Sequence, residues 1–184
     1  MCNHRSACIK LQRIDNWFAL WKLVVNKRRV VTARTKTDQF TDLILTVFRL
    51  NGVMTDWGDH FASAEGLSSA RWQMLGGVAM GDRPVTAPQV GARMGVSRQG
   101  AQKQLNVLVA AGLMEAQPNP MHKRSPLYAL TQHGRATLDS IDSRWRGHAA
   151  HAAAAFSTAD LETAAKVLTT LIALHGSTHL EQEA

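Results

Sequence analysis

The stretch that decides the fold is residues 86–131, which read TAPQVGARMGVSRQGAQKQLNVLVAAGLMEAQPNPMHKRSPLYALT. Thr86 is a helix-capping residue type, and it precedes apolar residues at helical spacing. The stretch therefore predicts a short helix over 87–94, a turn at Gly95 and a second helix over 98–111. Two short helices joined by a tight turn are the helix-turn-helix arrangement.

A basic hairpin is expected directly after these helices. Gly112 stands in the usual helix-ending position, and short apolar runs at 113–117 and 127–130 predict two strands. The loop between them, 118–126, is polar and holds His122, Lys123 and Arg124. Such a wing can reach a flanking minor groove, where a narrow and strongly negative channel attracts arginine. A polar face alone is weak evidence for DNA binding, because any surface helix has one. The order helix, turn, helix, strand, wing, strand is far more specific for a DNA-binding domain.

The helix expected over 98–111 has two unlike faces. The face expected to bury against the domain consists of Ala101, Leu105 and Leu108, with Val96 and Leu113 beside them. The opposite side chains suit a major groove, because Arg and Lys reach guanine acceptors while Gln and Asn can pair bidentately with adenine. A glycine and a helix N-terminus here allow close approach of phosphates. The predicted DNA contacts are Ser97, Arg98, Gln99, Gly100, Gln102, Lys103 and Asn106, with Lys123 and Arg124 from the wing.

Residues 38–176 resemble the multiple antibiotic resistance regulator (MarR) family of bacterial transcription factors. Three segments carry the resemblance: APQVGARMGVSR (87–98), LVAAGLME (108–115) and LTQHG (130–134). The resemblance implies a two-fold dimer, built from contacts of the first and last helices, that binds a roughly palindromic operator in double-stranded DNA. One departure concerns the wing, which in the family usually carries Asp-x-Arg. Here His122 stands at the Asp position and Arg124 is retained, so the carboxylate that normally orients the arginine is missing.

The expected fold class is mostly α with a small β-hairpin wing, that is, a winged helix-turn-helix lobe plus a helical dimerisation region. Asp38 opens the first predicted helix of the body, and Thr131 caps a long later helix. The expected divisions are a basic leader (1–36), a MarR-like body (37–176) and a C-terminal tail (177–184). Within the body we expect a DNA-binding lobe over 68–131 and dimerisation helices over 38–62 and 132–176.

The same resemblance implies repression that is relieved by a small lipophilic or phenolic ligand or by cysteine oxidation. The oxidation route needs a thiol near the first helix of the body, but the only cysteines are Cys2 and Cys8. A ligand cleft is more plausible, because apolar walls with a few polar groups suit small molecules. Its expected lining is Trp57, His60, Phe61, Arg71, Trp72 and Met74. The alternative is that Trp72 and Met74 are ordinary core residues and His60 lies on the surface.

The positive charge of the chain is concentrated at its start. The net charge is +7, but residues 1–36 carry nine Lys and Arg side chains and one acid, which leaves the rest close to neutral. Local basic clusters must therefore carry the argument for DNA binding. Three interpretations of residues 1–36 stay open. They form an extra dimer-stabilising helix or a basic arm that contacts phosphates, or they form a helix that lies on a membrane surface. In the third interpretation translation truly begins downstream, for instance at Val30 or Val31. The sharp break in composition favours the third.

Other classes of protein fit less well. No apolar run approaches the roughly 18 residues that a membrane span needs, and no secretory signal is visible, so we expect a cytoplasmic protein. Usable spacings for a nucleophile–base pair, a phosphate loop or a metal cluster are absent from the sequence, so we expect no enzyme, cofactor or metal. The histidine pairs His148/His151 and His175/His179 lack a third ligand and are interpreted as surface. The remaining alternatives are a winged helix used for protein contacts alone and a regulator held at a membrane surface by its leader.

Overall fold

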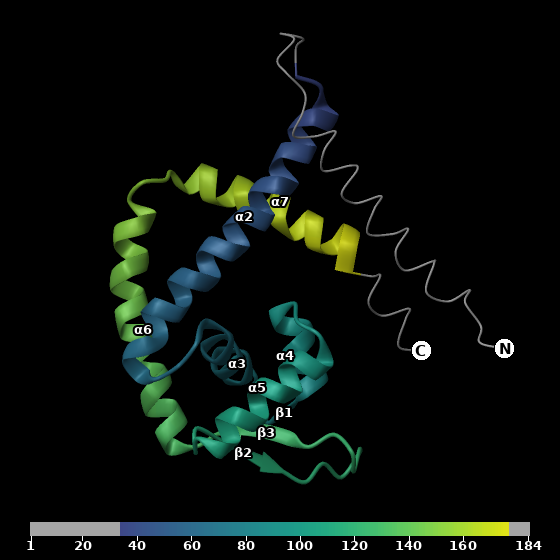
Figure 1. Cartoon of the computed structure of the whole chain (residues 1–184), viewed down its shortest axis with the longest axis vertical. Helices are drawn as coiled ribbons and strands as arrows, with labels where there is room; N and C mark the ends of the chain where they lie inside the picture. Colours follow the sequence, from purple (N-terminus) through teal and green to yellow (C-terminus); the bar gives the residue numbers. More distant parts are fainter. Residues whose placement is uncertain (1–33, 177–184) are drawn as a thin grey trace, which may run out of the picture. The chain divides into compact units, whose positions relative to one another are not determined.

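The structure is a computed structural model that describes residues 34–176 (Figure 1). The described residues divide into two compact units, one ending at Arg49 and the other beginning at Leu50. Its elements are α2 (Lys36–Ala62), η1 (Ser63–Glu65), α3 (Ser69–Ala79), β1 (Val85–Thr86), α4 (Ala87–Met94), α5 (Arg98–Ala110), β2 (Met114–Gln117), β3 (Leu127–Leu130), α6 (Gln132–Ala153) and α7 (Thr158–Gly176). The predicted fold, mostly helical with a small hairpin, is confirmed. The predicted leader lies almost wholly outside the described residues, and the tail lies wholly outside them.

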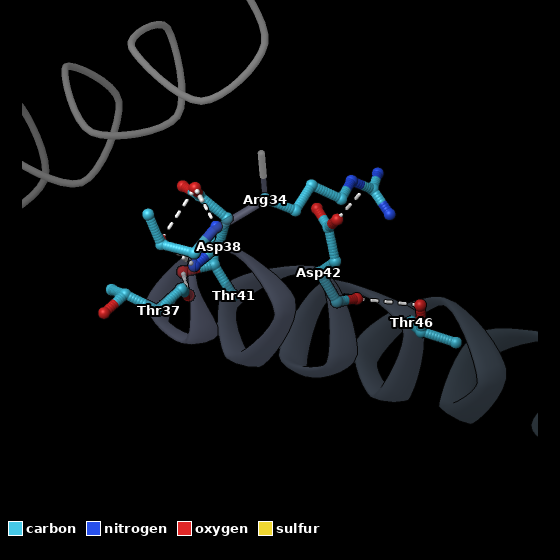
Figure 2. Close-up of polar contacts among 7 residues, drawn as sticks. Arg34, Thr37, Asp38, Thr41, Asp42 and Thr46 are labelled. Atoms are coloured by element: carbon cyan, nitrogen blue, oxygen red, sulfur yellow. Dashed lines mark hydrogen bonds and ion pairs between the residues drawn. The ribbon is translucent and has the colours of Figure 1, made fainter. Parts of the chain in front are cut away.

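Helix α2 begins at Lys36 with a reciprocal cap. The backbone N–H and hydroxyl of Thr35 donate to Asp38 Oδ2 at 3.1 and 2.8 Å, and the Asp38 N–H donates back to Thr35 Oγ1 at 3.1 Å. Arg34 Nη2 lies 3.0 Å from Asp42 Oδ2. Figure 2 shows this ion pair. Asp38 therefore lies in the first turn, as its charge favours, and Thr35 supplies the cap.

The sheet has three antiparallel strands in the order β1-β3-β2. The two predicted strands form the hairpin, in which Met114 pairs with Leu130 and Gln117 with Leu127. Strand β1 was not predicted, because two residues are too short to show a periodic pattern. It adds a second partner to β3, so that β3 is central in the sheet.

The hydrophobic core lies where α3, α4, α5, the sheet and α6 meet. Its fully buried large side chains include Met74, Leu75, Val90, Leu105, Leu108, Met114, Tyr128 and Ile141. The predicted burial of Ala101, Leu105, Leu108 and Leu113 is confirmed. The predicted burial of Val96 is wrong, since its side chain is 39% exposed. The backbone of Val96 makes the contact instead, because its N–H donates to Gly91 O at 3.0 Å in the turn after α4.

The end of the hairpin is fastened to the end of α5 by a group of short contacts. Thr131 Oγ1 donates to Gly112 O at 2.7 Å, and the Thr131 N–H donates to Leu113 O at 3.2 Å. The same hydroxyl accepts from the Gly134 N–H at 3.0 Å, so Thr131 caps α6 as predicted. A Cβ added to Gly134 would lie 2.0 Å from Leu113 O, so only glycine allows this approach.

The last helix differs from the others because none of its residues is buried. Ser157 caps α7: its N–H and hydroxyl donate to Asp160 Oδ2, and its Oγ accepts from the Asp160 N–H. The hydrogen bonds from the hydroxyl and then the N–H of Ser157 hold the pKa of Asp160 below its ordinary value.

We expect Gly134→Ala to destabilise the fold by about 3 kcal/mol, the upper part of the range for overpacked sites, because the new methyl overlaps the Leu113 carbonyl. Gly147→Ala in the same helix is the matched control, since a Cβ there meets nothing within 4 Å. It should be neutral or stabilising by up to about 1 kcal/mol. Urea unfolding of both variants measures the difference, and equal midpoints would show that Gly134 has room for a side chain.

Candidate nucleic-acid interface

Helix α5 begins at a tight, fully capped turn. Gly95 adopts φ 67°, a left-handed conformation that glycine takes readily, and so ends α4. Ser97 then caps α5, with its Oγ accepting from the Gly100 N–H at 3.1 Å. The Ser97 hydroxyl is therefore engaged within the protein, and its expected part in phosphate binding rests on the adjacent helix N-terminus.

The predicted polar face of α5 lies on the surface. Arg98, Gln99, Lys103 and Asn106 are exposed, whereas Gly100 and Gln102 are half-buried. Within the described residues neither Arg98 nor Lys103 has a carboxylate within ion-pairing distance. These two charges are therefore available to an anionic partner.

Gln102 is tied into the protein by a contact that the sequence did not predict. Its Nε2 donates to the Tyr128 hydroxyl, and also to Asn106 Oδ1 at 2.8 Å. Tyr128 comes from β3 and is 1% exposed. The alternation of buried residues along β3 could have placed this ring inward, and a buried tyrosine hydroxyl requires a hydrogen-bond partner. The identity of that partner depends on how α5 packs on the sheet.

The wing is an exposed loop braced by an asparagine. Asn119 Nδ2 donates to Ser125 O at 2.8 Å, and Asn119 Oδ1 accepts from the Met121 N–H at 3.1 Å. Met121, His122, Lys123 and Arg124 are all exposed. No described carboxylate pairs with Arg124, in keeping with the missing Asp of the Asp-x-Arg pattern. Figure 1 shows this loop extending from the β2–β3 hairpin.

Comparisons with known proteins agree with this geometry. The MarR family model matches residues 65–125. An uncharacterized protein of Mycobacterium tuberculosis is 44% identical over 108 residues, which cover 59% of this chain and 74% of that protein. The crystal structure of a MarR family transcription regulator is 29% identical with a TM-score of 0.64, covering 81% of this chain and 97% of that one. This chain belongs to the MarR family.

Two more distant structures share the MarR fold. A mutant MarR of Escherichia coli complexed with operator DNA is 18% identical with a TM-score of 0.63, covering 75% of this chain and 99% of that one. CouR from Rhodococcus jostii, bound to p-coumaroyl-CoA, is also 18% identical with a TM-score of 0.63, and the match covers 76% and 95% of the two chains. MarR family members are transcription regulators and not enzymes, in agreement with the sequence-based prediction. Among the described residues no helix is long and apolar enough to span a membrane.

The six residues expected to line an effector cleft in this MarR chain do not lie together. Trp57, Phe61 and Trp72 form an aromatic cluster, with ring centroids 4.8 Å apart for Trp57–Phe61 and 5.3 Å for Phe61–Trp72. Met74 is buried in the core and His60 is exposed, as the alternative interpretation held. Arg71 lines a separate cavity of about 590 Å³. Neighbours on a helix point in different directions, which separates Arg71 from Trp72.

The aromatic cluster includes residues of α6 that the sequence did not indicate. The Trp145 ring lies 5.8 Å from Trp72, and His148 lies 4.7 Å from Trp57. Trp72 and Trp145 both line a cavity of about 400 Å³. His148 therefore packs on an indole, and no group of three metal-ligating side chains occurs within residues 34–176. His179 lies outside the described residues.

We expect Lys103→Ala to weaken DNA binding almost equally for all sequences, because an exposed lysine contacts phosphates and carries little base information. The slope of log K against log salt should fall by about 1 in magnitude. Arg98→Ala should in addition relax base preference at one operator position. Gel-shift titrations at several salt concentrations measure both effects.

Lys166→Ala is the control for these titrations, since Lys166 is an exposed lysine of α7 that lies outside the apolar stripe. It should leave affinity and salt slope unchanged. Full affinity in both Lys103→Ala and Arg98→Ala would reject the assignment of this face to DNA.

Proposed function

We propose that this chain is a homodimeric, operator-binding transcription repressor whose α5 enters the major groove while its wing reaches the adjacent minor groove. The observation that carries the proposal is the exposed face of α5, on which Arg98 and Lys103 have no described carboxylate partner. The exposed Lys123 and Arg124 add positive charge on the neighbouring hairpin. A surface used only for protein contacts has no need of cations and amides at this spacing. The related MarR of Escherichia coli was solved with operator DNA.

The proposed dimer rests on the apolar surface of α7. Its exposed hydrophobic residues are Leu161, Val167, Leu168, Ile172 and Leu174. A helix with such a stripe and no buried residue gains little stability from its own chain, and a monomer rarely exposes so large an apolar surface. A second copy of the chain would cover it. Two copies related by a two-fold axis would place two α5 helices on a palindromic site.

We expect Ile172→Glu to convert the dimer to a monomer, because it places a charge in the proposed interface. The residue is 71% exposed, so the substitution should not unfold the chain itself. Sedimentation equilibrium should report a mass near 20.2 kDa for the variant and twice that for the parent. The DNase footprint of the parent should cover two half-sites about one helical turn or more apart, and the variant should lose most of its affinity.

Ala173→Glu is the matched control, because Ala173 is exposed and its neighbours one and two turns back on α7 are the polar Thr169, Thr170 and Lys166. Its mass and footprint should equal those of the parent. A parent that is monomeric, or a dimer that survives Ile172→Glu, would contradict the proposed interface. A dimer that protects no DNA would favour the protein-interaction alternative.

We propose further that the repressor is released from DNA by a small lipophilic or phenolic ligand at the aromatic cluster of Trp57, Phe61, Trp72, Trp145 and His148. The cluster supplies stacking surfaces with an imidazole beside them, and Arg144 lies 4.6 Å over the Phe61 ring. Arg144 also pairs with Glu65, just after the end of α2. A ligand here would contact α2, α3 and α6 together. If its contacts are better in one arrangement of these helices than in another, its binding shifts the protein toward the better-bound arrangement. The related CouR was solved with p-coumaroyl-CoA.

We expect a phenolic carboxylate to lower operator affinity of the parent and to quench its tryptophan fluorescence. Trp145→Ala should require at least about tenfold more ligand for release, since one stacking wall is lost. His60→Ala, an exposed residue outside the cluster, should respond as the parent does. Equal responses of all three proteins would place the effector elsewhere.

A further inference from the structure

Three polar side chains at the outer end of the core share one hydrogen-bond network. Gln102 Nε2 donates to the Tyr128 hydroxyl and, at 2.8 Å, to Asn106 Oδ1. The Tyr128 hydroxyl donates to the same Asn106 Oδ1 at 3.4 Å. Gln102 and Asn106 stand one turn apart on α5, in the middle of the face assigned to DNA. The network therefore joins the buried tyrosine to two of the side chains expected to meet bases.

The hydrogen bonds of the network determine which polar atoms of Gln102 and Asn106 remain free to contact a base. A glutamine amide has two N–H donors and one oxygen acceptor. Both donors of Gln102 are engaged, one by Tyr128 and one by Asn106. Asn106 Oδ1 accepts two of these bonds, whereas its Nδ2 is not part of the network. Toward the solvent the pair therefore offers Gln102 Oε1 as an acceptor and Asn106 Nδ2 as a donor.

This arrangement conflicts with bidentate adenine recognition by Gln102. That contact needs the amide oxygen for adenine N6 and the amide nitrogen for adenine N7. Freeing one N–H of Gln102 for adenine would break its bond either to the buried Tyr128 hydroxyl or to Asn106 Oδ1. Without Gln102 the buried hydroxyl would keep only its 3.4 Å bond to Asn106, and without the Asn106 bond the two amides would no longer be held together, so we expect DNA binding to leave the network intact.

The position of Tyr128 is itself rigid. It pairs with Ala116 on one side and with Val85 on the other, so β3 holds its backbone from both edges. The ring is fully enclosed by the core. The hydroxyl therefore acts as a fixed point toward which the two amides of α5 orient.

We propose that Tyr128 is a specificity-determining positioning residue: it orients the Gln102 and Asn106 amides so that Gln102 reads a base only as an acceptor and Asn106 only as a donor. The base group that meets Gln102 is then an exocyclic amine, cytosine N4 or adenine N6. The group that meets Asn106 is guanine O6 or N7, adenine N7 or thymine O4. The inference rests on the proposed DNA binding and defines which bases the site selects.

Tyr128→Phe tests the proposal, because it keeps the buried ring and removes only the hydroxyl. Sequences are selected from a randomised DNA library with the full-length parent and variant, and affinity for non-specific duplex is measured in parallel. We expect base preference at one or two positions of each half-site to change by about tenfold or more. Non-specific affinity should stay within about twofold, since the phosphate contacts are untouched. Thr170→Val, which removes a hydroxyl from α7, should change neither.

A second pair of variants keeps the test independent of the stability of the tyrosine variant. Gln102→Glu keeps acceptor oxygens but removes both hydrogens that bond to Tyr128 and Asn106, so it should change base preference at the same position of the half-site as Tyr128→Phe. Gln102→Leu should lose the preference. An unchanged preference in Tyr128→Phe, or in Gln102→Glu, would overturn the positioning role. If the parent itself selects no sequence, the proposed function fails, and this inference fails with it.

Discussion

The burial of one face of α5 is the constraint on which the rest of the interface depends. Ala101, Leu105 and Leu108 are completely enclosed. Rotating the helix about its axis would expose them, and each leucine contributes about 1.5–3 kcal/mol when buried. The side chains opposite are therefore turned to the surface, and only Gln102 among them is half-buried, where it reaches the Tyr128 hydroxyl. The position of the candidate contacts on α5 is thus a consequence of hydrophobic packing, although none of those contacts is itself hydrophobic.

Two sets of contacts hold α5 and the wing hairpin in a fixed arrangement. At the far end of α5, Thr131 bonds the Gly112–Leu113 turn, and Gly134 lets α6 approach the Leu113 carbonyl. In its middle, the Tyr128 hydroxyl from β3 contacts Gln102. Because β3 also ends the wing hairpin, these contacts hold the hairpin at a set place beside α5. If α5 and the wing moved independently, DNA binding would have to order them and would lose conformational entropy. A preorganised surface avoids that loss.

The lobe and α7 differ in what stabilises them. The lobe from α3 to β3 has a dense core of its own, whereas α7 buries none of its residues. A leucine- and isoleucine-bearing helix of that kind is stabilised mainly by what it packs against. The positive charge is also unevenly distributed. The net charge of +7 arises from residues 1–36, whereas the proposed DNA interface depends on a few exposed cations.

The sequence by itself determined the local features of this protein, because each depends on residues close together in the chain. The caps at Thr86, Ser97 and Thr131, the glycines that end α4 and α5, and the two strands of the hairpin all follow from short-range spacing. Tertiary structure alone decided the pairing of β1 with β3, the exposure of Val96, the addition of Trp145 to the aromatic cluster and the separation of Arg71 from it. Gln102 and Tyr128 are 26 residues apart, and only the packing of α5 on the sheet brings their polar atoms together. Such contacts depend on the global arrangement of elements, which no local pattern encodes.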